Sequence, residues 1–243
     1  MRVVFIASDA SLYGANLSLV NLIKSDDFED CLVLVPSKGP FLSVLKEMGI
    51  AYKVVPFRFN SAVYDKDWLS YVLYPVRFCY YWVLNKYSYY RILKIVDDRK
   101  IDVIHTNDNR VSIGFEVAKC RSIKHIWHLR EFIDLDFNMR IFKPFRKLCA
   151  DFNNSDSVIC VSEAVKNHFC IRNKNSVVLY DAVDSIRNLP DRREKKENYF
   201  LFCGSLLEKK GVFDAISSFS KVSKNCDIRL YIAGTASLSR QQA

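Results

Sequence analysis

Short apolar runs alternate with segments of helical length along most of the chain, and each run is apolar at consecutive positions. Such runs are typical of strands that are covered on both faces, as in a parallel sheet whose strands are joined by helices. Right-handed connections between these strands give a doubly wound α/β fold, so we expect a Rossmann-like domain over residues 1–183. The predicted strands are residues 3–7, 31–36, 51–57, 102–107, 124–130, 157–162 and 176–183.

A single glycine, Gly14, follows the first strand in the stretch SDASLYGANLSLV. The apolar spacing predicts a helix over residues 14–23 with Leu19, Leu22 and Ile23 on its buried side. A glycine at this point lets the backbone approach a phosphate, and the helix start offers free N–H groups to an anion. A dinucleotide site needs G-x-G-x-x-G and an acid after the second strand, which here runs into PSKGP. The pattern therefore excludes NAD and leaves a simpler anion site.

The segment 56–96 is an insertion after the third predicted strand. Its part 68–90 holds ten aromatic residues, and no acid occurs between Trp68 and Val96. One interpretation is a pair of aromatic helices that pack on the domain, because Pro75 is expected to interrupt a single long helix. The other is a basic, aromatic face over residues 68–96 that meets an anionic membrane surface. The residue pattern leaves both open.

A charged, proline-bearing stretch at residues 184–198, DSIRNLPDRREKKEN, predicts a linker. The apolar pattern then restarts as YFLFCG, KKGVFDAISSFSKV and DIRLYIAG, which indicates strand, helix and strand. Residues 199–243 are fewer than the roughly 100–150 of a typical domain. We therefore expect the first βαβ unit of a second, incomplete Rossmann-like domain.

The amino-acid composition limits the classes of partner that the chain is expected to bind. The chain has 243 residues, half of them hydrophobic, and a formal net charge of +9. The charge calls for an acidic partner, and because no nucleic-acid-binding motif accompanies it, we expect phosphate-bearing substrates or a membrane surface and no nucleic acid. Eight cysteines without a C-x-x-C pair indicate reduced core residues and no zinc site. With no signal peptide before the first strand, the expected location is cytoplasmic.

Polar residues follow two neighbouring predicted strands, as HTND at 105–108 and WHLRE at 127–131. His128, Arg130 and Glu131 are three polar groups directly after an apolar strand, where packing does not require them. A histidine can hydrogen-bond a sugar hydroxyl, an arginine can bind an anion, and a glutamate can orient either group or act as a base. This cluster is the strongest candidate for a functional site.

The stretch GSLLEKKG, residues 204–211, repeats the anion-site pattern after the first strand of the second domain. A glycine turn is followed by Lys210 and Gly211 at a helix start, which combines backbone N–H groups with an ammonium. The stretch is not a P-loop, because Val212 stands where Lys is required. The remaining histidines His125 and His168 are interpreted as structural.

Taken in order, these motifs resemble those of the retaining GT-B glycosyltransferases of the "group 1" family, of the bacterial polysaccharide-biosynthesis type. The stretches that carry the resemblance are YGAN, DVIHTN, IWHLRE, SDSVICVSEAVKNHF, VLYDAVD and GSLLEKKG. The resemblance implies a Rossmann-like acceptor domain and a second Rossmann-like domain that holds most of a nucleotide-sugar donor. It also implies transfer of a hexose-type sugar, with retention and without a metal or other cofactor, to a lipid-linked or polysaccharide acceptor in cell-surface glycan synthesis.

The resemblance assigns roles by position. The implied catalytic residues are His128, Arg130 and Glu131. The implied donor diphosphate-binding residues are Gly14, Ser205, Lys210 and Gly211. The implied residues of the acceptor cleft are Tyr13, Asn16, Asn107 and Asp108.

The chain departs from the family pattern in three respects. Ser205 stands where the family has an arginine, Asn16 stands where an acid is common, and the family's paired-glutamate motif lies beyond the residues present. Two alternatives follow: a truncated, non-catalytic binding module that needs a partner chain, and a nucleotide-sugar epimerase on the same fold.

Overall fold

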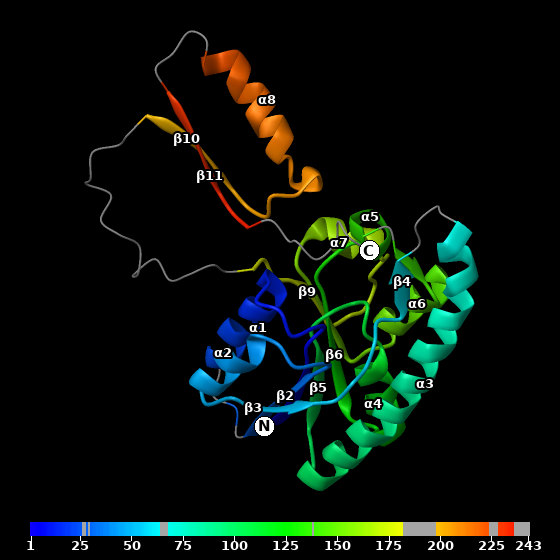
Figure 1. Ribbon diagram of the computed structural model, residues 1–243. Helices are drawn as coiled ribbons and strands as arrows, with labels where there is room; N and C mark the ends of the chain where they lie inside the picture. The colour runs from blue at the N-terminus through cyan, green and yellow to red at the C-terminus, as the bar shows by residue number, and fades with distance from the viewer. Residues whose placement is uncertain are drawn as a thin grey trace. The chain divides into compact units, whose positions relative to one another are not determined.

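The computed structural model divides the chain into two compact units, Met1–Val183 and Asp184–Ala243 (Figure 1). Each unit is described by itself. The predicted linker, 184–198, lies outside the described residues except for its last position. The residues that the structure describes are 1–25, 28, 30–63, 68–137, 139–181, 198–223 and 228–235.

The first unit is built on a sheet of seven parallel strands in the order β3-β2-β1-β5-β6-β8-β9. The chain first adds strands on one side of β1 and then returns to add β5 on its other side, so the sheet is doubly wound, as predicted. The strands are β1 Arg2–Ile6, β2 Asp30–Val35, β3 Ala51–Val54, β5 Val103–Thr106, β6 Lys124–Leu129, β8 Ser157–Cys160 and β9 Ser176–Val178.

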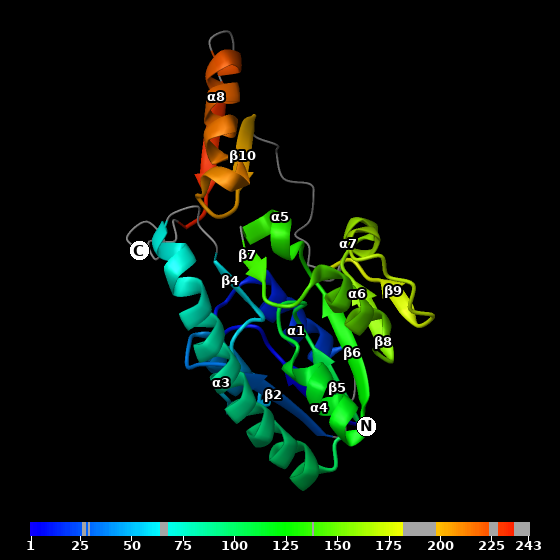
Figure 2. The ribbon, with the colours of Figure 1, turned by 90° about the vertical axis from the view of Figure 1, so that its right-hand side faces the viewer.

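Helices cover both faces of this sheet (Figure 2). Alternate residues of each strand point to opposite faces, so Phe5 of β1 packs in the cluster under α1 and α2, whereas Ile6 packs in the cluster under α3 and α4. The apolar runs of the sequence are the physical basis of this double burial. The helices are α1 Gly14–Lys24, α2 Phe41–Glu47, α3 Trp68–Arg99, α4 Ile113–Arg121, α5 Ile133–Phe137, α6 Phe145–Asn153 and α7 Glu163–His168.

Helix α1 begins where the sequence predicts, at Gly14. Leu19 and Ile23 are buried as expected, but Leu22 is only half-buried, and Asn16 and Val20 are buried with them. The buried face of α1 is therefore rotated toward the polar loop before it.

The predicted break at Pro75 is wrong, because α3 is one helix of 32 residues that contains this proline (Figure 2). Pro75 lies in the second turn, so it removes a single intrahelical hydrogen bond, the one to the carbonyl of Tyr71. The other end of α3 is anchored in the core by buried apolar side chains, among them Ile92 and Val96. That burial outweighs one lost hydrogen bond, and a pair of helices does not form.

A small antiparallel pair joins the insertion to the rest of the unit. Strand β4 Ser61–Val63 pairs with β7 Met139–Ile141, with Ala62 opposite Arg140. This pair lies outside the main sheet. It brings the start of the insertion beside the segment that follows β6.

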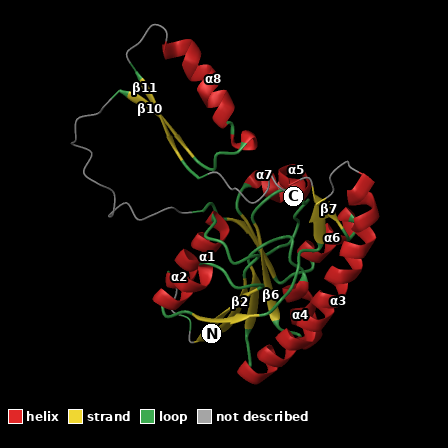
Figure 3. Ribbon diagram, viewed as in Figure 1, coloured by secondary structure: helices red, strands yellow, loops and turns green. Residues whose placement is uncertain are grey.

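The second unit contains the predicted βαβ element (Figure 3). Strands β10 Tyr199–Cys203 and β11 Arg229–Ala233 are parallel and are connected through α8 Val212–Val222. A short 3-10 helix, Glu208–Lys210, precedes α8. Gly211 between them has φ of +76°, a left-handed conformation that glycine adopts without the strain of a side chain.

Candidate functional site

The loops that follow β1 and β5 lie at the point where the strand order of the sheet reverses. In doubly wound sheets, ligands bind beyond the carboxyl ends of the strands at this point. Polar side chains are buried there in unusual number, although polar groups are rarely placed in a core without a reason. Those at or near these strand ends are Ser8, Asn16, His105, Asn107, Asp108, Asn109 and His128, each 5% exposed or less.

The loop after β1 is held by Asn16, whose amide donates to the Asp9 carboxylate at 3.0 Å and to the Ser11 carbonyl at 2.8 Å. Asn16 is thus committed to shaping the loop in front of α1. The neighbouring Tyr13 is the N-cap residue of α1 and is 61% exposed. Its side chain makes no capping bond, and the first turn of α1 carries no acidic residue, so backbone N–H groups at this helix start are available to an anion.

Arg130 connects four segments of the unit. Its Nε donates to the Asn107 side-chain oxygen at 3.0 Å, and one terminal nitrogen, Nη1, donates to Asp181 at 2.8 Å. The other, Nη2, donates to the Ser18 hydroxyl of α1 at 3.2 Å. Asn107 in turn donates to the Ala15 carbonyl at 3.0 Å. The side chain of Arg130 is 5% exposed, so these bonds hold the guanidinium in a defined place.

His128 lies next to this guanidinium, with its Nδ1 3.4 Å from Arg130 Nη2. A guanidinium can only donate, so Nδ1 must accept and the ring proton resides on Nε2. That Nε2 is buried and has no partner among the described residues. The ring of His105 lies 5.5 Å from that of His128, and its own buried Nε2 also lacks a partner in the described part of the chain.

Burial lowers the pKa of both rings, and the positive charge of Arg130 adds to the effect. The pKa of His128 falls to about 2 and that of His105 to about 3. Both rings are therefore neutral at physiological pH. A neutral imidazole whose buried N–H has no partner is suited to donate a hydrogen bond to a ligand that completes the site.

Glu131 belongs to a separate cluster around Arg110. The Arg110 guanidinium lies 2.7 Å from the Asp108 carboxylate and 2.7 Å from that of Glu131, and it stacks over the Phe59 ring at 4.2 Å. The Trp127 indole N–H donates to the Asp108 carbonyl at 3.1 Å. The carboxylates of both acids are thus paired with one buried cation, which fits them for positioning rather than for proton transfer.

The sequence-predicted residues of the second unit lie in one loop. Ser205 is half-buried, and its carbonyl accepts from the Leu207 N–H at 2.8 Å. Lys210 is exposed at the end of the 3-10 helix, directly before Gly211, which is the N-cap residue of α8. As with α1, no side chain caps this helix start.

Sequence reasoning missed four residues of the site: Ser18, His105, Arg110 and Asp181. Asp181 and His105 fall within VLYDAVD and DVIHTN, stretches already singled out, so a signal for them was present. Ser18 and Arg110 carry no sequence signal, since their roles depend on which loops meet in space. Within the described ranges, no group of three or more His, Cys, Asp or Glu side chains is arranged to hold a metal ion.

The fold of the chain is similar to that of several solved glycosyltransferases. HepE of Anabaena, in complex with UDP-glucose, superimposes with a TM-score of 0.66 at 17% identity, over 99% of this chain and 62% of that one. The lipopolysaccharide outer core galactosyltransferase WaaB gives 0.62 at 16% identity, over 98% and 62%. Arabidopsis thaliana UGT89C1, complexed with UDP-L-rhamnose, gives 0.57 at 15% identity, over 97% and 69%.

These likenesses confirm the predicted GT-B fold class, and the chain spans about 62% of the HepE structure. None of the curated protein sequences compared with the chain matches it significantly. No described helix is both long enough and apolar enough to cross a bilayer. The family model named Glycosyltransferase Family 4 matches residues 41–187, more than half of the sequence. The chain therefore belongs to Glycosyltransferase Family 4.

Proposed function

We propose that the chain acts as a glycosyltransferase that moves a hexose-type sugar from a nucleotide sugar to a lipid-linked or polysaccharide acceptor, with retention at the anomeric carbon. The observation that carries this proposal is the neutral, buried His128, whose Nε2 proton has no partner among the described residues. The family supports the reaction class. The UDP-sugars named with HepE and UGT89C1 support a nucleotide-sugar donor.

His128 and Arg130 bind and orient the transferred sugar in this proposal. The Nε2 proton of His128 donates to a sugar hydroxyl, and Arg130 fixes the ring tautomer through Nδ1. Arg130 also adds a positive charge close to the reacting centre. Glu131 acts through Arg110, which holds its carboxylate, and so it is a positioning residue rather than a base.

The diphosphate of the sugar nucleotide accumulates negative charge as its bond to the sugar breaks. The uncapped start of α1 at Gly14 offers backbone N–H groups to that charge, and Lys210 with the uncapped start of α8 offers a second such group. We infer that these positive groups do the work that a metal does elsewhere. Ser205, which carries no charge, leaves more of this role to Lys210.

Retention follows if the acceptor attacks on the face that the diphosphate leaves. The bond between the anomeric carbon and the diphosphate oxygen breaks, and the bond from that carbon to the acceptor oxygen forms. The proton of the acceptor hydroxyl passes to the leaving diphosphate, so no protein nucleophile is needed. Tyr13, Asn107 and Asp108 lie at the strand ends that face the acceptor in this scheme.

We place the acceptor at the inner face of a membrane, in cell-surface glycan synthesis. The net charge of +9 and the exposed aromatic residues of α3 support an anionic surface as partner. Cysteine spacing supports a reducing, cytoplasmic compartment. No observation favours a non-catalytic module or an epimerase over this function.

A direct test measures donor binding and transfer. UDP-glucose and UDP are titrated into the chain by calorimetry, and a panel of labelled nucleotide sugars is assayed for transfer. His128→Gln is expected to lower transfer about 10²-fold, the scale of a lost transition-state hydrogen bond. The matched control is His168→Gln, because His168 pairs with Asp134 away from this cluster. Equal rates for His128→Gln and the unsubstituted protein would reject the site.

A further inference from the structure

Helix α3 carries a continuous apolar stripe on its exposed side. The residues of the stripe recur every third or fourth position, the spacing that keeps them on one face of a helix. Each is between 54% and 76% exposed, although all are large and apolar or aromatic. The stripe consists of Trp68, Val72, Val76, Tyr80, Val83 and Tyr87.

Packing within the unit does not account for this stripe. The buried residues of α3, which include Ser88, Ile92 and Val96, lie toward its carboxyl end and hold the helix on the sheet. The stripe projects from the same helix into solvent. Contiguous apolar surface of this extent on a folded protein marks an interaction site.

The charges on α3 indicate the partner. The helix carries Arg77, Lys86, Arg91 and Lys94 and no acid before Asp97. Lys86 lies over the rings of two neighbouring tyrosines at 5.1 and 5.3 Å, so its charge sits beside aromatic faces. Aromatic rings flanked by cations are typical of the boundary between lipid headgroups and acyl chains.

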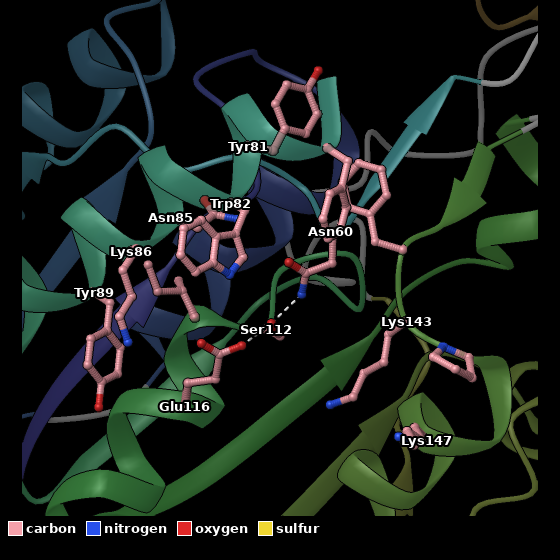
Figure 4. A pocket seen from close by; sticks show the side chains of 14 residues that line it. Asn60, Tyr81, Trp82, Asn85, Lys86, Tyr89, Ser112, Glu116, Lys143 and Lys147 are labelled. Carbon is pink, nitrogen blue, oxygen red and sulfur yellow. Dashed lines mark hydrogen bonds between the residues drawn. The ribbon is translucent and has the colours of Figure 1, made fainter. Parts of the chain in front are cut away.

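A groove of about 440 Å³ lies on the other side of α3, between this helix, the start of α4 and the segment 142–147, and no residue of the stripe lines it (Figure 4). Trp82 forms one wall, and Lys86, Lys143 and Lys147 bring ammonium groups to it. Lys143 pairs with Asp151, but Lys147 has no ion pair in the part of the chain that the structure describes.

One acid, Glu116, also lines the groove, where its carboxylate accepts from the Ser112 hydroxyl at 2.8 Å. The three lysines outnumber it, so the groove is positive on balance. A second groove shares Lys143 and adds Arg140, together with Asp134. The cations therefore extend along the side of α3.

We propose that α3 lies along the surface of an anionic lipid bilayer, with its apolar stripe at the headgroup boundary and with Lys86 and the exposed Lys94, which share the face of the stripe by their helical spacing, against lipid phosphates. This deepens the proposed function by naming the surface at which the acceptor is met. From Trp68 to Tyr87 the stripe is roughly 30 Å long at 1.5 Å per residue, a length suited to a helix lying in the plane of the interface.

A second copy of the chain fits the stripe poorly. Pairing two α3 helices through this face brings the four basic residues of each toward those of the other, with no acid between Trp68 and Val96 to compensate. A bilayer that contains acidic lipids supplies the missing negative charge. Charge complementarity therefore favours an anionic lipid surface over a second copy of the chain as the partner of the stripe.

The test is flotation of the chain with vesicles of phosphatidylcholine, alone or mixed with phosphatidylglycerol. We expect flotation only with the mixed vesicles and a loss of flotation as salt is raised. Lys86→Gln and Lys94→Gln are each expected to weaken binding about fivefold. The matched control is Lys46→Gln with Lys53→Gln, because both lysines are exposed and lie on α2 and β3.

The apolar contribution is tested with Val72→Ser and Val76→Ser together, which should weaken flotation. Val177→Ser, an exposed valine of β9, should not. Equal weakening by the lysine pair on α2 and β3 would mean that net charge alone drives binding and would overturn the proposal. So would a dimer, seen by sedimentation, that the Val72 and Val76 changes dissociate.

Donor binding keeps this proposal separable from the proposed function. UDP-glucose titrations without lipid should be unchanged in all of these variants, since none of the changed residues belongs to the polar cluster around His128 and Arg130. If the chain binds UDP-glucose but does not float, the membrane surface is rejected and the transferase stands. If it floats but binds no nucleotide sugar, the surface stands and the transferase is rejected.

Discussion

Arg130 and Asp181 form an ion pair in which the guanidinium lies 2.8 Å from the carboxylate, although 51 residues separate them in the chain. The two partners are unequally buried: the Arg130 side chain is 5% exposed and that of Asp181 is 47% exposed. Asp181 also accepts from the Ser18 hydroxyl at 2.6 Å. The pair therefore joins the end of β6, the segment after β9 and helix α1 at one point.

This asymmetry predicts unequal effects on stability. Arg130→Met leaves the Asn107 oxygen without this donor, but the Asp181 carboxylate is half in solvent and still accepts from Ser18, so the change should cost about 1–2 kcal/mol in urea unfolding. Asp181→Asn should cost more, about 3 kcal/mol, because it removes the counter-charge of the buried Arg130 guanidinium. Arg121→Met, which breaks an exposed pair with Asp97, serves as the control and should cost less than either. Equal costs at the two ends of the Arg130 pair would contradict this interpretation.

Gly14 and Gly114 are expected to have different roles: Gly14 serves ligand binding, and Gly114 serves packing. A methyl group at Gly114 would collide with the Thr106 side chain and with Ile6, so Gly114→Ala should destabilise the chain by about 1–3 kcal/mol. A methyl group at Gly14 would meet nothing within 4 Å, so Gly14→Ala should leave stability unchanged or raise it slightly.

The same Gly14→Ala change should weaken binding of UDP-glucose, because the methyl group occupies the space through which a diphosphate approaches the start of α1. Thermal unfolding and calorimetric titration of one protein sample measure both effects. Weaker binding together with lower stability would instead mean that the loop has been distorted.

Three buried histidines predict a pH-dependent stability. Burial lowers the pKa of His105 and His125 to about 3 and that of His128 to about 2. The unfolded chain takes up these protons below about pH 6.5, whereas the folded chain does not. Stability is therefore complete above that pH and falls with decreasing pH, by about 1.4 kcal/mol per pH unit for each histidine, until the folded pKa values are reached.

Urea unfolding at pH 7, 6 and 5 measures this slope. His105→Phe removes one of the three groups and replaces it with a ring that can occupy the space between Phe5 and His128. The slope should then fall by about a third. Identical slopes in the two proteins would show that His105 titrates normally.

Lys210 is expected to bind the diphosphate, and α8 offers a control on the same unit. Lys210→Ala should weaken UDP binding about tenfold or more, because a charge-assisted bond to phosphate is lost. Lys221→Ala, in the last turn of α8, changes the net charge equally and should have no effect. If both changes weaken UDP binding alike, the assignment of Lys210 fails.

The alternation of apolar runs and helical segments was enough to predict the parallel sheet, the first turn of α1 and the βαβ element of the second unit. These features depend on which faces of a strand or helix are apolar, and that is written locally in the chain. The cluster HTND and WHLRE was likewise visible, because polar residues directly after an apolar strand indicate a ligand-facing edge.

Pro75 is a position at which the local sequence pattern gave the wrong prediction. Its penalty is confined to one hydrogen bond, whereas the burial of Ile92 and Val96 on the sheet acts on the whole helix. Whether α3 stays one helix depends on the free energy lost with one hydrogen bond and the free energy gained by burying apolar side chains on the sheet. The second quantity is known only from the folded unit.

The features of the candidate site also divide into those that the sequence predicts and those that only the tertiary structure shows. The sequence by itself determined that His128, Arg130 and Glu131 stand at a strand end, because their spacing follows from one strand. Only the tertiary structure decided that Arg130 meets Asp181 and Ser18 and that Glu131 is held by Arg110. It also decided that the Nε2 of His128 is buried without a hydrogen-bond partner among the described residues. The hydrogen-bond partners and the burial of these side chains depend on segments that meet only when the sheet has formed. A local pattern along the chain does not specify them.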